Sequence, residues 1–235
     1  MAPRPYRSTL RDEQARLTGQ RIVAAAVELF VAHGYAATTI DAIAERAGVS
    51  RKTVFSSVGG KAALLKQAFD TTLAGDNEPL AIADRPPWQQ AMRQHDPVGV
   101  LAAWIAMNVA IAQRVAPLHH VLIIAADRDA DAAALLADTD RQRAEGNRAL
   151  VERLAELGGL RPGIDLGHAA AIADALIDPS LYRRLVVTHA WPLEHYTAYL
   201  RQVATTSLLD SRHQQTPPEL TAPPGDQRTT TPGGR

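Results

Sequence analysis

The sequence of 235 residues contains no cysteine. This absence excludes disulfide bonds, zinc sites built on thiolates and catalysis by a thiol, and it suits a reducing cytoplasm. Residues 1–14 lack the apolar core of a signal peptide. The most apolar run, residues 98–112, includes Asn108 and is shorter than the roughly 20 apolar residues that a membrane-spanning helix needs. We therefore expect a soluble cytoplasmic protein without a membrane partner.

The sequence also lacks net charge, because 25 Lys and Arg balance 25 Asp and Glu. The two signs are unevenly distributed, however. Residues 1–66 contain ten basic and five acidic side chains, a net charge of +5, and the rest of the chain carries −5. A basic end on a neutral chain is expected when one end meets phosphate and the other does not. The distribution indicates a nucleic-acid partner for the N-terminal part.

Apolar residues recur with helical periodicity from Thr18 onward, and no segment alternates convincingly with the two-residue period of a strand. We therefore predict an all-α fold. Pro117 is expected to end the long apolar helix. The helices predicted after residue 96 span roughly 97–115, 118–127, 130–157, 166–177, 180–189 and 193–209.

Three segments show no such periodicity. Residues 1–17 are polar and basic, which predicts a flexible basic arm. Residues 75–97 contain several prolines and indicate a connector with one short helix. Residues 210–235 are rich in Pro, Thr, Gln and Gly and have hardly any apolar residues, which predicts a disordered tail.

Residues 38–61, TTIDAIAERAGVSRKTVFSSVGGK, indicate two short helices joined by a tight turn at Gly48. Thr38 or Thr39 can cap the first helix, and Ser50 can cap the second. The second helix carries polar and basic side chains on one side, which are able to hydrogen-bond in a major groove. This combination is typical of a helix-turn-helix.

Residues 18–69 resemble the DNA-binding domain of the tetracycline-repressor (TetR) family: a helix ending in LFVAHGY, then TTIDAIAERAGVS, a short helix and GGKAALL. Residues 160–200 also resemble the effector domains of many members. The resemblance implies an N-terminal three-helix helix-turn-helix domain at 18–66. It implies a C-terminal helical bundle at 67–209 that binds an effector and dimerises, with no cofactor.

The resemblance and the helix-turn-helix pattern together predict a set of residues that contact DNA. The family usually has Tyr where Phe55 stands, followed by an x-His-Phe pattern, whereas Ser56, Ser57 and Val58 follow here. This departure leaves the contribution of Phe55 open between packing on its own domain and contact with DNA. The predicted DNA-binding residues are Thr38, Thr39, Ser50, Arg51, Lys52, Thr53, Phe55, Ser56 and Lys61.

The helix that begins near Val98 is apolar on nearly all sides, so we expect it to be central. Asn108 is the polar exception on its face, and a buried amide needs a partner, either a ligand or a neighbouring helix. An apolar lining would indicate an apolar or aromatic effector; for each candidate, a place in the core or on the surface is the alternative. The predicted ligand-binding residues are Trp104, Met107, Asn108, Ile111, His119 and Asn147, with Trp88 and Met92 as further candidates.

Two helices, at 166–177 and 193–209, are predicted to form a homodimer. The first has a face of small residues (Ala169, Ala170, Ala173, Leu176), and the second carries larger apolar side chains (Tyr196, Tyr199, Leu200, Val203). Burial of these faces against their own chain is the alternative. A dimer would place two recognition helices in successive major grooves of a palindromic operator, about 34 Å apart.

Signals for catalysis or for a metal are weak. Gly60-Lys61 ends like a phosphate-binding loop, but Phe55 and Ala62 stand where Gly and Ser/Thr are required. His119 and His120 are adjacent and would point about 100° apart on a helix. We therefore predict a non-enzymatic DNA-binding regulator, most simply a repressor released by its effector. Two alternatives are a helical binding protein or enzyme with a vestigial helix-turn-helix, and a DNA-binding protein whose effector core is closed.

Overall fold

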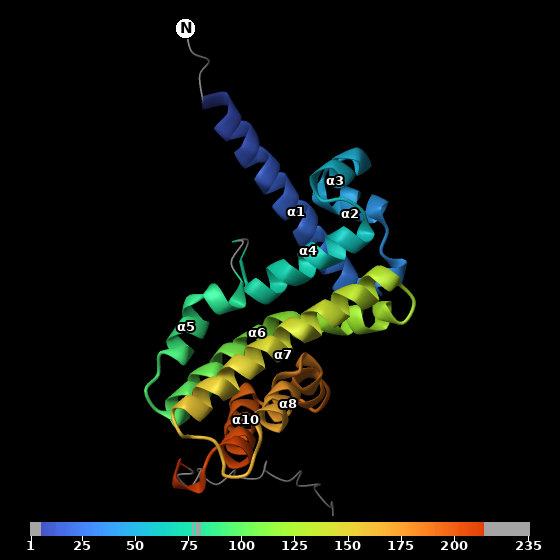
Figure 1. The fold of residues 1–235 in the computed structure, drawn as a ribbon. Helices are drawn as coiled ribbons and strands as arrows, with labels where there is room; N and C mark the ends of the chain where they lie inside the picture. Colours follow the sequence, from blue (N-terminus) through green and yellow to red (C-terminus); the bar gives the residue numbers. More distant parts are fainter. Residues whose placement is uncertain (1–5, 77, 79–80, 214–235) are drawn as a thin grey trace, which may run out of the picture.

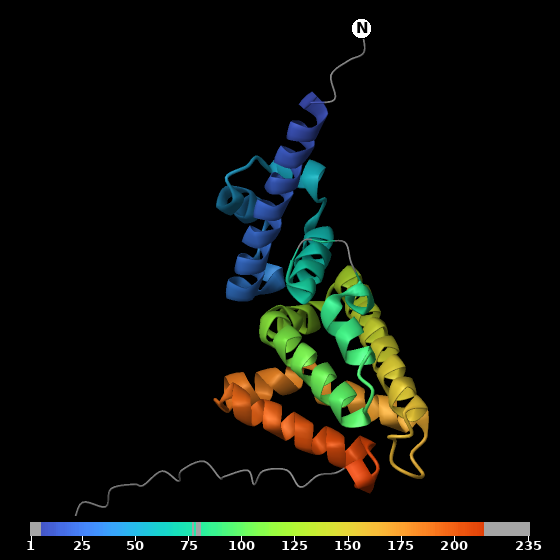
Figure 2. The same cartoon turned by 90° about the vertical axis from the view of Figure 1, so that its left-hand side faces the viewer.

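The computed structural model describes residues 6–76, 78 and 81–213. Apart from one isolated bridge, between Leu160 and Leu209, the regular structure in these residues is helical. The all-α prediction is therefore confirmed. Figure 1 and Figure 2 show two parts, an N-terminal domain at one end of the molecule and a larger C-terminal domain at the other. The N-terminal part comprises α1 (Tyr6–Ala37), α2 (Ile40–Ala47), α3 (Arg51–Ser57) and α4 (Lys61–Ala74).

The C-terminal part is arranged around one central helix. That helix, α6, touches α1 and α4 as well as α5, α7, α8, α9 and α10. A six-residue π-helical segment follows α9. The elements are a 3₁₀ turn at Ile82–Asp84, α5 (Pro86–Met92), α6 (Pro97–Ala126), α7 (Ala130–Glu156), α8 (Leu166–Ile177), α9 (Pro179–Tyr182), the π-helical segment Arg183–Thr188, α10 (Leu193–Leu208) and a 3₁₀ turn at Ser211–His213.

The two short helices of the motif are defined by their caps. Thr39 Oγ1 accepts a hydrogen bond from the Ala42 amide (3.1 Å) at the start of α2. Gly48 ends α2 with a φ of 66°, in the left-handed region that glycine adopts without strain. Ser50 Oγ then accepts from the Thr53 amide (3.1 Å) and starts α3. The predicted turn and caps are therefore present, with Thr39 rather than Thr38 as the first cap.

Helix α6 continues through Pro117, contrary to the predicted stop. Proline lacks the amide hydrogen that would bond the carbonyl four residues back, which costs about 3 kcal/mol in a helix interior. The residues around it, Val115, Ala116, Leu118 and Leu122, are buried. Each large apolar side chain buried in this way contributes about 1.5–3 kcal/mol, so their combined burial outweighs the cost of the proline. By length and composition α6 would also suffice to span a membrane, but it lies in the core of the fold.

Helix α1 begins at Tyr6, so residues 6–17 form helix and not the flexible arm that the sequence predicted. Residues 11–16 are all exposed, which explains why no apolar periodicity marks them. The segment contains no Pro or Gly, and Arg16 pairs with Glu13 one turn away. Figure 1 shows this end of α1 projecting past α2 and α3. Residues 1–5 lie outside the described residues.

Two apolar clusters stabilise the fold. The first unites the N-terminal domain with the second half of α6 and the start of α7, through Phe30, Phe69, Leu118, Leu122 and Leu135. The second joins the first half of α6 to α7, α8 and α10. Because the first cluster crosses between the two parts, the DNA-binding motif and the C-terminal domain are mechanically connected.

The predicted tail begins later than expected. Asp210 is still tied to the fold through its amide, which donates to Gly159 O (2.9 Å), and Ser211–His213 form a 3₁₀ turn. Residues 214–235 of the predicted tail lie outside the described residues.

Candidate functional site

One buried residue orients α3 so that its polar side faces away from the domain. Val54 is fully buried under α3, and this fixes which side of the short helix faces away from the domain. Arg51, Lys52, Phe55 and Ser56 are accordingly exposed. These four residues form a continuous face with two positive charges and one aromatic ring, as contact with a major groove requires.

Arg51 connects α3 to α2 and to Phe55. Its Nη1 lies 2.8 Å from Asp41 Oδ2, and its guanidinium carbon lies 5.7 Å from the centre of the Phe55 ring. Both partners of the ion pair are more than half exposed, so the pair stabilises the fold by at most about 1 kcal/mol. The ring of Phe55 is 47% exposed, which favours contact with DNA over packing on its own domain.

The remaining predicted DNA-binding residues serve as caps or supports. Thr39 and Ser50 are exposed caps, and Thr53 is half-buried with its Oγ1 2.8 Å from Ser50 Oγ. Lys61 opens α4, where its Nζ donates to Ala36 O (3.3 Å) and lies 4.3 Å from the centre of the Tyr35 ring. Burial lowers the pKa of Lys61, and the charge of Asp129 partly opposes this. Lys61 therefore joins the start of α4 to the end of α1.

Thr38 lies in the interior, and the prediction that it contacts DNA is wrong. It is only 3% exposed. Its Oγ1 lies 2.8 Å from Gly34 O and 3.1 Å from Leu29 O, so its hydroxyl donates between these carbonyls. The hydroxyl holds the kink inside α1 at Gly34, whose φ is 80°. From the sequence, a threonine beside an N-cap could either contact DNA or hydrogen-bond inside its own domain. The kink of α1 brings the carbonyls of Leu29 and Gly34 to Thr38, and this places its side chain in the interior.

A cavity of about 620 Å³ lies in the C-terminal domain, against α4. Its volume falls within the range of small-molecule sites. The further candidate Trp88 lines it as well, whereas Met92 is not among its lining residues. The structure brings together all six residues predicted for a ligand, Trp104, Met107, Asn108, Ile111, His119 and Asn147.

The polar residues that line this cavity, Glu145 among them, lie on α6 and α7. Asn108 Nδ2 donates to Trp104 O in its own helix (2.9 Å), and Asn147 Nδ2 donates to Asp174 Oδ1 (2.9 Å). The His119 ring is buried, and its Nε2 has no hydrogen-bond partner in the described part of the chain. Burial is the main cause that lowers the pKa of His119. A neutral imidazole with one free nitrogen therefore forms part of a mostly apolar wall.

Several lining residues were not predicted. Thr139, Gln142, Arg143 and Gly146 follow one face of α7 at helical spacing, but a polar face normally indicates solvent. Arg143 is held there by ion pairs with Asp140, Asp174 and Asp178. Phe69 and Leu73 line the cavity from α4, and their spacing in the sequence matches any buried helix face.

The face predicted for dimerisation is buried within the chain itself. Ala169, Ala173, Leu176, Tyr196 and Leu200 are each less than 9% exposed and belong to the second apolar cluster. Ala170, Tyr199 and Val203 are half-buried and pack against the same cluster. Most of the predicted face therefore packs against its own chain, as the alternative held. Helical periodicity identifies an apolar face but not the surface that covers it.

Comparison with known proteins identifies the N-terminal motif. Residues 22–68 match the model of the bacterial regulatory proteins of the tetR family. Residues 22–68 therefore form a domain of the tetR family. The chain is 35% identical over 98 residues to the uncharacterized HTH-type transcriptional regulator TtgW of Pseudomonas putida, over 42% of this chain and 63% of TtgW. The same identity and length relate it to the HTH-type transcriptional regulator SrpR of the same species, over 39% of SrpR. The match thus spans less than two thirds of either relative.

Solved tetR-type structures share the fold of the whole chain. SmeT, the repressor of the Stenotrophomonas maltophilia multidrug efflux pump SmeDEF, aligns with a TM-score of 0.62 at 20% identity, over 87% of this chain and 96% of SmeT. A SmeT–triclosan complex aligns with a TM-score of 0.61 at 19% identity, over 89% of this chain and all of that one. At these identities the likeness establishes the architecture, an N-terminal helix-turn-helix and a C-terminal helical domain.

Proposed function

We propose that this tetR-family chain is a DNA-binding transcriptional repressor that a small molecule releases from a palindromic operator. One observation carries the proposal: the exposed basic face of α3 and a ligand-sized cavity are connected through a single helix. α4 starts with Lys61 at the DNA-binding domain, and its Phe69 and Leu73 line the cavity. A ligand that displaces these two side chains would move α4 and with it the DNA-binding domain.

The effector we infer is an uncharged aromatic molecule with one hydrogen-bonding group. The indole rings of Trp88 and Trp104 and the side chains of Met107 and Ile111 offer apolar contact. The free Nε2 of His119 offers one hydrogen bond. Such an arrangement favours a ligand that is apolar except for one polar group. A polar atom of the site that stays without a hydrogen-bond partner would reduce the affinity. Triclosan, which is bound to SmeT in a structure of similar fold, has this chemistry and is a suitable probe.

The proposed active species is a homodimer in the cytoplasm. With the predicted face buried, the surface available for a partner is the outer side of α8, α10 and the segment between them. Ala171, Ala175 and Val187 lie on this surface, with Val187 exposed, and the half-buried Trp191 packs edge-on against Tyr199 with 5.7 Å between ring centroids. A symmetric contact of this kind would set the two recognition helices about 34 Å apart.

The first experiment is selection of binding sites from a random duplex library, followed by fluorescence anisotropy on the enriched sequence. We expect a palindrome whose half-sites are one helical turn apart. The Arg51→Ala/Lys52→Ala variant should lose this binding, whereas Arg93→Ala/Arg148→Ala, which removes the same charge from the C-terminal domain, should keep it. Failure to enrich any sequence would contradict the repressor and favour the vestigial helix-turn-helix.

A second titration tests the effector. Triclosan should quench tryptophan fluorescence, since two of the three tryptophans line the cavity, and it should dissociate the DNA complex over the same concentration range. His119→Leu should weaken triclosan binding and leave operator affinity unchanged. Operator binding that no apolar aromatic probe affects would support the alternative of a closed effector core.

A further inference from the structure

A second hollow, of about 380 Å³, lies on the other side of His119 from the effector cavity. It is formed between α6 and the segment from α9 to residue 189. Of the described residues that line it, none carries a carboxylate. Its polar lining consists of His119 itself and of Arg183, Arg184, His120, His189, Ser180 and Thr188.

The positive charge of this hollow is not neutralised from within the described chain. Arg183 and Arg184 form no ion pair with any described residue, in contrast to Arg143, which is held by three aspartates. Asp178 lies nearby, but its carboxylate already accepts from Arg143 Nη2 (3.3 Å) and from the Ser180 amide (2.7 Å). Two free guanidinium groups in a concave surface concentrate a positive potential there.

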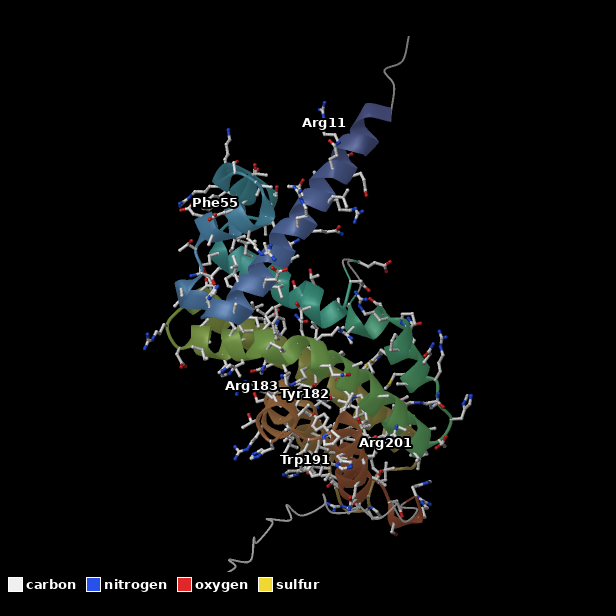
Figure 3. All side chains as sticks on the ribbon, turned by 180° about the vertical axis from the view of Figure 1, so that it is seen from behind. Arg11, Phe55, Tyr182, Arg183, Trp191 and Arg201 are labelled. Atoms are coloured by element: carbon white, nitrogen blue, oxygen red, sulfur yellow. The ribbon has the colours of Figure 1, made fainter. Side chains whose placement is uncertain are left out.

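The backbone explains how both arginines reach the same hollow. Consecutive side chains on an α-helix point about 100° apart, but Arg183 and Arg184 open the π-helical segment, which changes this spacing. Such wide turns are frequent at functional sites. Two residues after the segment, Ala190 has a φ of 54°, the one positive value for a non-glycine residue in the described chain, which is uncommon for alanine. Figure 3 shows Arg183 beside Tyr182, where the C-terminal helices meet α6.

A buried nitrogen without a partner supplies an independent observation. His119 is 3% exposed and lines both hollows, and its Nε2 makes no hydrogen bond within the described residues. Buried polar atoms are almost always paired, so an orphan of this kind indicates a missing partner. A ligand in either hollow would contact the wall that His119 forms.

We propose that this hollow is an anion-binding site, separate from the apolar cavity, that accepts a carboxylate or phosphate group. Guanidinium groups bind both oxyanions through paired N–H donors, and the hydroxyls of Ser180 and Thr188 add neutral donors at its rim. His120 and His189 add donors whose strength increases when they are protonated. Because His119 belongs to both walls, an anion bound here alters the surface that the effector meets.

The test is isothermal titration of the full chain with sodium phosphate and, separately, sodium acetate, at constant ionic strength set with chloride. Either anion should bind saturably, and comparison of the two identifies whether phosphate or carboxylate is preferred. Arg183→Gln/Arg184→Gln should reduce the affinity for the preferred anion at least tenfold. Arg201→Gln, which neutralises an exposed arginine of α10 outside the hollow, should change it less than twofold.

A measurement on the unmodified protein avoids dependence on the folding of the double variant. In histidine ¹H–¹³C spectra, the imidazole signals of His120 and His189 should shift saturably with the preferred anion, and those of the exposed His33 and His168 should not. Uniform small shifts, or equal losses of affinity in the Arg201→Gln control, would overturn the site.

A second copy of the chain filling the hollow with its own acidic residues would also overturn the proposal. In that case neither anion would bind, and Arg183→Gln/Arg184→Gln would shift the sedimentation of the protein toward the monomer. None of these readouts involves DNA, so the anion site and the proposed repressor function fail independently.

Discussion

Phe55 is the residue of α3 at which the motif departs from the usual tetR-family pattern, and it is also the most exposed aromatic ring of the helix-turn-helix. Its ring lies beneath the guanidinium of Arg51, which in turn is held by Asp41. This stack fixes the ring in place before DNA arrives. An apolar ring in a major groove can recognise only an apolar feature, and the thymine methyl is the one that the groove offers.

We therefore predict that Phe55 reads a thymine methyl. Replacing the thymines of the selected operator one at a time by deoxyuridine should weaken binding severalfold at one position in each half-site. Phe55→Ala should bind the operator more weakly. Replacing the sensitive thymine by deoxyuridine should not weaken the binding of this variant further. Ser57→Ala, on the same helix, should retain the sensitivity to uracil. A Phe55→Ala variant as sensitive as the original would show that the ring does not read the methyl.

His119 gives the fold a dependence on pH. Burial, the charge of Arg143 and that of His120 lower its pKa, while Asp178 and Asp140 oppose this. The unfolded chain, with a pKa of about 6.5, then binds a proton that the folded chain does not. The free energy of unfolding should therefore fall as pH decreases below about 6.5 and should not change on this account above it.

Urea denaturation at a series of pH values measures this effect. The difference in stability between the natural chain and His119→Phe should be constant above about pH 6.5 and should shift in favour of His119→Phe below it. His33→Gln, which changes an exposed histidine, should differ from the unmodified chain in free energy of unfolding by the same amount at every pH. A constant difference across the whole range would mean that His119 keeps its ordinary pKa in the fold.

At the scale of elements, α4 is the connection between the two halves, and Arg114 of α6 holds its end. Arg114 donates to Thr72 O (3.4 Å) and Leu73 O (3.1 Å), the carbonyls that the last turn of α4 leaves free. A basic group at this terminus also complements the helix dipole. The guanidinium packs against Gly75, where a Cβ would approach it within 3.1 Å.

We predict that Arg114→Met uncouples effector from operator. Loss of two exposed hydrogen bonds should reduce the free energy of unfolding by about 1–2 kcal/mol. The triclosan concentration that releases DNA should change, while triclosan affinity without DNA should not. Arg93→Met, on an arginine of the same domain that lies away from α4, provides the control. An unchanged release curve would assign the coupling to the Phe69 and Leu73 contacts alone.

Local signals made the N-terminal motif predictable, because caps and turns depend on residues within one helical turn of each other. Thr39, Gly48 and Ser50 therefore appear where expected. Features that depend on distant packing were predicted less well. Pro117 lies within α6 because its neighbours are buried, and residues 11–17 are part of α1 although all of them are exposed. Four of the residues of α6 that line the cavity were predicted from their spacing, whereas the lining residues on α4 and most of those on α7 required the fold.

At the scale of the whole molecule, two of the exposed large apolar side chains belong to α8 and to the segment before α10. Val187, at 62%, is the most exposed of the large apolar residues described, and it lies between α8 and α10. Leu166, at the start of α8, is 40% exposed. Isolated apolar residues on a surface are ordinary, but these lie on the side of the two helices that the chain itself leaves uncovered. That position fits the proposed symmetric interface.

We predict that Val187→Asp converts the dimer to a monomer and weakens operator binding by more than about tenfold. Burying an unpaired carboxylate twice in a symmetric interface is unfavourable, and a monomer contacts only one half-site. Ile124→Asp changes a similarly exposed residue (57%) at the far end of α6 and should leave both properties unchanged. Sedimentation velocity and anisotropy on full and half operators measure the two effects, and circular dichroism checks the fold. A dimeric Val187→Asp protein with undiminished operator affinity would place the interface elsewhere on the molecule.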